Sequence, residues 1–266
     1  MEAKIPELLK LIEKQNKITI LFAVEAGSRA WELNSQESDY DVHFVYYRTL
    51  EEYISVNKLS EEISAGFDRD FNQVKREGAF IEMNGFDIFK YFKLLSSSNV
   101  ATIEWINSDI VYIANNYGEL KSYFESNFNK SKAFLQLYNM SKGSYKSFTM
   151  KKDLNIKKYL HCIRLLLGAQ YVLNYKKLPN TSMIKNLEEL EKDIPTEVFK
   201  KIKELVELKI NGHGKDVVKD IPVIDNYFKE KYDEFEKLGY NKKKMDDKDV
   251  DVNFLNDFLR KLIIKK

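Results

Sequence analysis

The chain has 266 residues, and its 43 lysines and arginines almost balance its 41 aspartates and glutamates, so overall charge gives no argument for nucleic-acid binding. Hydrophobic residues make up 44% of the sequence, which excludes a largely disordered chain. No apolar run approaches the ~18 residues of a membrane span, so the sequence predicts no membrane partner. The lone cysteine, Cys162, excludes a disulfide framework and fits a reducing cytoplasm.

The first part of the chain predicts a small sheet. Residues 17–25, 41–47 and 78–84 are short runs of β-branched and aromatic residues, which are typical of strands. Residues 55–77 are polar and predict a loop or a short hairpin. Before the first strand, four apolar residues follow helical spacing and predict a helix that covers one face of the sheet: Ile5, Leu8, Leu9 and Ile12.

From Asp87 onward the apolar residues follow the period of a helix, and Asp87 itself stands where a helix N-cap is expected. Further helices are predicted near residues 116–127, 130–149, 153–175, 183–192, 196–210, 223–238 and 251–263. We therefore predict an α+β fold, with a mixed-sheet α/β domain over residues 1–115 and a helical domain over residues 116–266.

The segment that joins the first two predicted strands carries the chemistry. Gly27-Ser28 follows the first strand, ten residues intervene, and Asp39-Tyr40-Asp41 leads into the second strand. Glycine lets the backbone turn sharply and approach a ligand, and a serine hydroxyl can reach phosphate oxygens. Residues two apart on an extended segment point to the same face, so Asp39 and Asp41 are expected side by side.

Two carboxylates on one face repel each other unless a cation lies between them, and hard oxygen ligands suit Mg²⁺. The pair therefore fits a two-metal site for phosphoryl chemistry. An Asp-x-Asp motif alone is usually a turn or a solvated strand edge. Its position after Gly-Ser, with hydrophobic strands on both sides, favours the functional interpretation.

Residues 27–31 read Gly-Ser-Arg-Ala-Trp and residues 38–42 read Ser-Asp-Tyr-Asp-Val. This pattern resembles the signature of DNA polymerase β-like nucleotidyltransferases, and it is most similar to their RNA-ligase-associated (RlaP or YcgL-like) branch. Residues 84–90, 99–108 and 157–164 are similar to further segments of that branch. The resemblance covers about residues 17–180 and implies a polymerase β-like palm domain.

Enzymes of this kind move a nucleoside monophosphate from a nucleoside triphosphate (NTP) to an acceptor hydroxyl and release pyrophosphate. The resemblance implies that Asp39 and Asp41 bind two Mg²⁺ ions. A third carboxylate usually completes the site, and two residues compete for that role. Glu82 lies in the middle of the third predicted strand, whereas Asp87 lies in the segment that resembles the family motif. We expect Asp87 as the third metal ligand, with helix capping as its alternative role.

Positive charge should face the triphosphate. On the helix predicted for residues 153–175, Lys157, His161 and Arg164 share one face, although a solvated basic stripe has the same spacing. With the resemblance added, the expected nucleotide-binding residues are Gly27, Ser28, Arg29, Lys157, Lys158 and Arg164.

The sequence does not identify the acceptor of the nucleoside monophosphate. An RNA end, a protein and a small molecule are all candidates. A second hypothesis is a catalytically inactive nucleotide-binding module with a regulatory or scaffold role. Its motivation is the undecided third carboxylate and the sequence Glu32-Leu33, which follows Trp31 where the branch usually has glycine.

Overall fold

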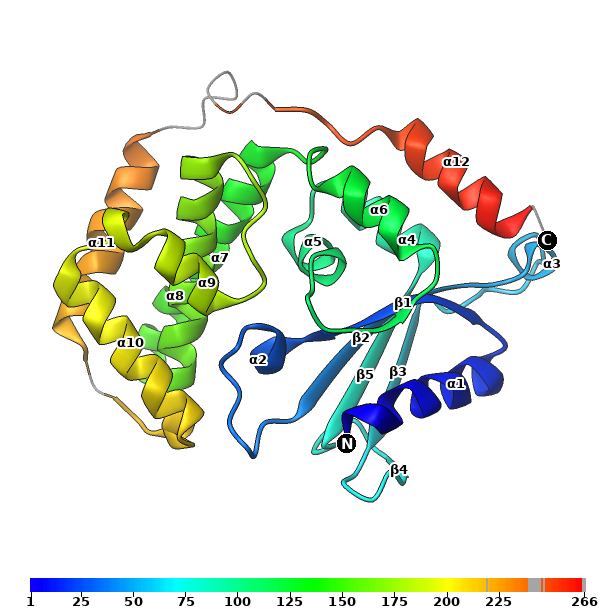
Figure 1. Ribbon diagram of the computed structural model, residues 1–266, viewed down its shortest axis with the longest axis horizontal. Helices are drawn as coiled ribbons and strands as arrows, with labels where there is room; N and C mark the ends of the chain where they lie inside the picture. Colours follow the sequence, from blue (N-terminus) through cyan, green and yellow to red (C-terminus); the bar gives the residue numbers. More distant parts are fainter. Residues whose placement is uncertain (219, 239–244, 246, 265–266) are drawn as a thin grey trace. The chain divides into compact units, whose positions relative to one another are not determined.

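The structure is a computed structural model that describes residues 1–218, 220–238, 245 and 247–264 (Figure 1). The contacts divide the chain into two compact units. The first consists of Met1–Ala30, Asp39–Asn127 and Asp249–Lys266, and the second consists of Trp31–Ser38 and Phe128–Lys248. The first unit thus extends beyond residue 115, where the sequence predicted the boundary between the two domains. It also includes the C-terminal segment that begins at Asp249.

Within the described residues, six strands of the first unit form one mixed sheet, in the order β4-β3-β5-β2-β1-β6. The β2–β5 pair is parallel and the other neighbours are antiparallel. The elements of this unit are η1 (Glu2–Lys4), α1 (Ile5–Asn16), β1 (Thr19–Ala26), α2 (Gly27–Ala30), β2 (Tyr40–Tyr47), α3 (Leu50–Tyr53), β3 (Glu62–Phe67), β4 (Gln73–Val74), β5 (Ile81–Asp87), α4 (Ile88–Ser96), α5 (Val100–Ile106), β6 (Val111–Ala114), α6 (Tyr117–Phe124) and α12 (Val252–Ile263).

Helix α1 covers one face of the sheet, and α4, α5 and α6 cover the other (Figure 1). The predicted apolar stripe of α1 is buried against the alternate residues Tyr40, Val42 and Phe44 of β2. On the opposite face, Phe22 of β1 contacts Tyr91 of α4, with ring centroids 5.5 Å apart. Both faces of the central strands are therefore covered, which explains the continuous apolar run of β1.

Helix α12 belongs to the first unit because its aromatic side chains pack there. Phe254 stacks on Tyr123 of α6 with ring centroids 3.8 Å apart, and Phe258 packs edge-on against Phe92 of α4. None of the helices in the described part of the chain is long and apolar enough to cross a membrane.

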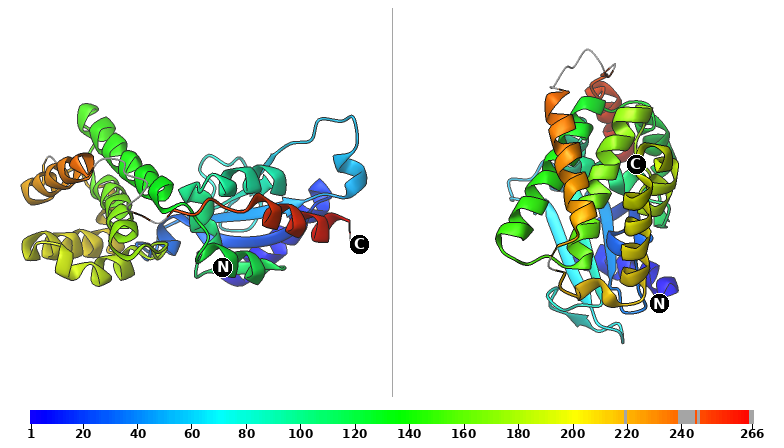
Figure 2. Two further views of the ribbon diagram at one scale, coloured as in Figure 1. Left: turned by 90° about the horizontal axis from the view of Figure 1, so that it is seen from above. Right: turned by 90° about the vertical axis from the view of Figure 1, so that its left-hand side faces the viewer.

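The second unit is helical, and α7, α8, α10 and α11 pack together in it (Figure 2). Helix α8 is buried along most of its length, so the other helices pack around it. Asn129, Asn155 and Ser182 cap the first turns of α7, α8 and α9 with their side chains. The elements are α7 (Lys130–Met150), α8 (Ile156–Tyr175), α9 (Met183–Glu189), η2 (Glu191–Asp193), α10 (Thr196–Ile210), η3 (His213–Lys215) and α11 (Pro222–Lys237).

Candidate active site

Gly27 lies directly against the carboxylate of Asp41. Strand β1 ends at Ala26, and the backbone of Gly27 turns there with a φ of +60°. A Cβ atom at this position would lie 1.8 Å from Oδ2 of Asp41, which is far inside van der Waals contact. Both the backbone conformation and the lack of space therefore require glycine. The sequence predicted a close approach at Gly27, and the group that approaches is an aspartate of the same site.

The two aspartates of the motif lie at the beginning of β2. Asp39 precedes the strand and is exposed, and Asp41 is its second residue and is half-buried. Because Tyr40 and Val42 pack in the core beneath α1, Asp41 and His43 point to the opposite face of the sheet. The ring of His43 packs there against Trp105 of α5, with centroids 4.5 Å apart.

Arg29 of α2 holds the beginning of β2. Its Nε donates a hydrogen bond to the backbone oxygen of Asp39 at 3.2 Å, and its guanidinium lies 3.7 Å from the centre of the Tyr40 ring. The side chain that the sequence assigned to phosphate binding thus contacts the Asp-x-Asp segment itself. Ser28, its neighbour in α2, is half-buried.

The parallel pairing of β2 with β5 decides which carboxylate lies beside Asp41. Glu82 is the residue of β5 opposite Asp41, and neighbouring residues in register share one face of a sheet. Asp87 is opposite Tyr46, five residues farther along β2. The strands therefore bring Glu82 to the aspartate pair and do not bring Asp87 there.

Asp87 has structural partners of its own. Its Oδ1 accepts a hydrogen bond from the backbone nitrogen of Phe89 and so caps α4. Its Oδ2 lies 3.1 Å from Nη1 of Arg48 and accepts a hydrogen bond from the hydroxyl of Tyr53. Burial raises the pKa of Asp87, although these three partners oppose the shift. Capping, which the sequence offered as the alternative role, is the geometry observed.

Glu25 lies beside Asp41 and was not predicted as a site residue. It is 1% exposed, and its carboxylate accepts hydrogen bonds from the backbone nitrogen of Asp41 at 2.9 Å and from the hydroxyl of Tyr112 at 2.6 Å. Burial raises the pKa of Glu25 to about 7, even though both hydrogen bonds lower it. A charged residue inside the apolar run of β1 was the available signal.

In the described residues, no group of three or more histidine, cysteine, aspartate or glutamate side chains is already arranged to hold a metal ion. Glu82 instead forms an ion pair with Arg76, whose Nε lies 2.9 Å from its Oε2. The donor set nevertheless fits Mg²⁺ in its chemistry, because Asp39, Asp41 and Glu82 all offer carboxylate oxygens.

The other three basic residues predicted to bind phosphate lie on α8 of the second unit. Lys157 is exposed, whereas Lys158 forms an ion pair with Asp153. Arg164 is only 8% exposed, and its guanidinium lies 4.0 Å from the centre of the Trp31 ring. Of the three, only Lys157 is exposed.

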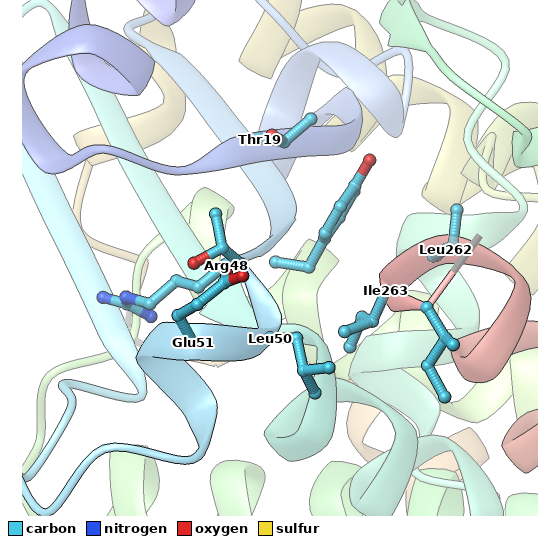
Figure 3. A pocket seen from close by; sticks show the side chains of 9 residues that line it. Thr19, Arg48, Leu50, Glu51, Leu262 and Ile263 are labelled. Carbon is cyan, nitrogen blue, oxygen red and sulfur yellow. The ribbon is translucent and has the colours of Figure 1, made fainter. Parts of the chain in front are cut away.

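A cavity of about 220 Å³ lies elsewhere in the first unit (Figure 3). It is lined by Thr19 of β1, by Arg48 and Leu50 beyond the end of β2, and by Ile263 at the end of α12. This is the Tyr47 end of β2, away from Asp41, so the cavity is separate from the aspartate pair.

Residues 1–261 match the family RlaP, described as an RNA repair pathway DNA polymerase beta family. The chain belongs to the RlaP family. A Bacillus subtilis (strain 168) relative, the uncharacterized protein YcgL, is 28% identical over 229 residues, which cover 85% of this chain and 84% of the relative. A solved structure of a nucleotidyltransferase-like protein from Exiguobacterium sibiricum 255-15 covers 86% of this chain and 74% of its own, with 12% identity and a TM-score of 0.36.

Membership of the RlaP family confirms the resemblance that the Gly-Ser and Asp-x-Asp motifs carried. It assigns the chain to the DNA polymerase beta families and supports nucleotidyl transfer as its general class of chemistry. The match also extends past residue 180, where the resemblance of the sequence motifs ended, and includes most of α12.

Proposed function

We propose that this protein is a Mg²⁺-dependent nucleotidyltransferase that moves a nucleoside monophosphate from an NTP to an acceptor hydroxyl and releases pyrophosphate. The observation that carries the proposal is the packing of Asp41 against Gly27 in a chain of the RlaP family. The polymerase β-like signature thereby has a physical reason, because the glycine makes room for a carboxylate of the site.

Asp39 and Asp41 would hold two Mg²⁺ ions, with Glu82 as the third carboxylate in place of Asp87. Bound metal would lower the pKa of the attacking hydroxyl and neutralise charge on the triphosphate. The support for Glu82 is its register opposite Asp41, and the argument against Asp87 is its engagement with Arg48 and α4.

Transfer of the nucleoside monophosphate forms one bond at the α-phosphorus and breaks another. The acceptor oxygen forms a bond to the α-phosphorus, the bond from that phosphorus to the bridging oxygen breaks, and pyrophosphate leaves. We assign the acceptance of the hydroxyl proton to Glu82, the proposed third carboxylate. The Ser28 hydroxyl is the proposed contact to phosphate oxygens of the triphosphate, because a hydroxyl donor suits that role.

We propose an RNA end as the acceptor. The support is the description of the family, which names an RNA repair pathway. Several exposed lysines of the second unit, among them Lys146, Lys151, Lys152 and Lys157, would supply the charge that a phosphate backbone requires.

Pyrophosphate release tests the proposal. The full-length protein is incubated with each NTP, Mg²⁺ and RNA that carries a 3′-hydroxyl, and pyrophosphate is measured against the Asp39→Asn, Asp41→Asn double variant. We expect release by the wild type and a loss of at least about 10³-fold in the variant. Equal release by both proteins would overturn the assignment.

The ion pair of Glu82 with Arg76 favours a second candidate, a nucleotide-binding module without transfer activity. Calorimetry separates the two. NTP binding without pyrophosphate release on RNA, protein or small-molecule acceptors would support the inactive module, whereas turnover would exclude it.

A further inference from the structure

Arg76 is the cation that lies beside Glu82. Its Nε is 2.9 Å from Oε2 of Glu82, and the two side chains are 56% and 28% exposed. The pair lies in the first unit, where Arg76 follows β4 by two residues and Glu82 is the second residue of β5.

The backbone of Arg76 is held against the sheet. A Cβ atom on Gly66 of β3 would lie 3.0 Å from the Cα of Arg76, so the absence of a side chain at Gly66 permits this close approach. The backbone oxygen of Arg76 also accepts a hydrogen bond from the nitrogen of Ala79 at 3.1 Å. Packing against Gly66 and the turn to Ala79 therefore fix the backbone of Arg76. From this position its guanidinium contacts the carboxylate of Glu82.

The guanidinium also lies on the face that carries the aspartate pair. Glu82 is opposite Asp41 in the β2–β5 register, and His43 follows on the same face of β2. The positive charge of Arg76 helps to lower the pKa of His43, after burial as the main cause. A cation of the protein itself thus lies beside the carboxylate that the proposed function assigns to a metal ion.

We propose that Arg76 is a positioning residue that holds Glu82 away from the metal site, so that a divalent cation must displace the guanidinium before three carboxylates can bind it. The inference rests on the proposed function, because it assumes that Asp39 and Asp41 hold the metal. A guanidinium and a divalent cation repel each other at one carboxylate, so the two compete for Glu82.

Mn²⁺ binding to the full-length protein, without nucleotide, tests the inference. Free Mn²⁺ is measured by its electron paramagnetic resonance signal during a titration. Removal of the guanidinium by Arg76→Met is expected to tighten binding by about two- to fivefold, the range that a partly exposed ion pair supports. Arg76→Lys, which keeps a cation, should stay closer to the wild type.

Lys75→Met is the matched control, because it removes one positive charge from the neighbouring exposed position. It should leave Mn²⁺ affinity almost unchanged. In a Glu82→Gln background, Arg76→Met should give no gain, since the carboxylate for which the two cations compete is gone. A gain of equal size from Lys75→Met, or one that persists with Glu82→Gln, would overturn the inference in favour of a general charge effect.

The outcomes also separate this inference from the proposed function. Suppose that wild type and Arg76→Met bind Mn²⁺ equally, and that the Asp39→Asn, Asp41→Asn double variant does not bind it. The inference that a metal ion displaces Arg76 is then wrong, whereas the proposed metal site at the two aspartates is supported. If the double aspartate variant binds Mn²⁺ as the wild type does, the metal site is wrong. If neither wild type nor Arg76→Met binds Mn²⁺, both are overturned. Thermal unfolding of each variant shows whether it is folded.

Discussion

At the scale of single residues, Asp41 is held from two sides. Gly27 leaves room for its carboxylate, and the buried carboxylate of Glu25 accepts a hydrogen bond from its backbone nitrogen. Such support fixes a catalytic side chain before the substrate arrives. The glycine could be predicted from the motif. The charge of Glu25 inside an apolar run was a signal, but its role could not be predicted, because that role depends on the pairing of β1 with β2.

Gly27→Ala is expected to remove activity without removing a single polar group. The new methyl group would collide with Oδ2 of Asp41, and the φ of +60° is unfavourable for alanine. We predict a loss of Mn²⁺ binding and of transfer. Gly118→Ala in α6 is the control, since nothing lies within 4 Å of the methyl group there. Normal transfer by Gly27→Ala would contradict the proposed packing of the site.

Because His161 is half-buried, we expect the free energy of unfolding to depend on pH. Burial lowers the pKa of His161 from 6.5 to about 4, with Arg164 and Lys157 as further causes. Between these values the unfolded chain binds a proton that the folded chain does not, so stability falls as the pH drops from 6.5 through 4. His161→Gln should reduce that fall by about 1–3 kcal/mol, measured by urea unfolding between pH 7 and pH 4. An identical fall in both proteins would contradict this assignment.

At the scale of elements, the parallel β2–β5 pair decides the composition of the site. The runs of β-branched and aromatic residues predicted β1 and β2 to within two residues, because strand formation there depends on local sequence, whereas β5 lies three residues later than its predicted range of 78–84. The weak polar hairpin β3–β4 was predicted only as an alternative, and the short, exposed β6 was missed. The register that places Glu82 opposite Asp41 is a tertiary property, so the sequence could not decide between Glu82 and Asp87.

Asp87→Asn and Glu82→Gln are expected to act on different properties. Asp87→Asn leaves the buried Arg48 without its charged partner and should lower the free energy of unfolding by about 2–4 kcal/mol, while the folded protein keeps Mn²⁺ binding. Glu82→Gln should weaken Mn²⁺ binding with a change in stability below about 1 kcal/mol. Urea unfolding and Mn²⁺ titration measure the two effects. The reverse assignment of effects would make Asp87 the third carboxylate.

At the scale of the whole molecule, the two units do not follow the order of the chain. Helix α12 returns to the first unit through Phe254 and Phe258, and residues 31–38 are grouped with the helical unit. In that unit the backbone oxygen of Trp31 accepts a hydrogen bond from the nitrogen of Met183. The sequence predicted most helices from their periodicity, but contacts across more than a hundred residues leave no local signal.

The central claim is that Asp39 and Asp41 direct transfer of a nucleoside monophosphate. The most direct measurement compares NTP labelled with ³²P at the α-phosphate or at the γ-phosphate, incubated with Mg²⁺ and RNA. We expect the α-label to become attached to the RNA and the γ-label to leave as pyrophosphate, and we expect Asp39→Asn with Asp41→Asn to prevent both. Transfer of the γ-label, or transfer of the α-label by the double variant at the wild-type rate, would contradict it.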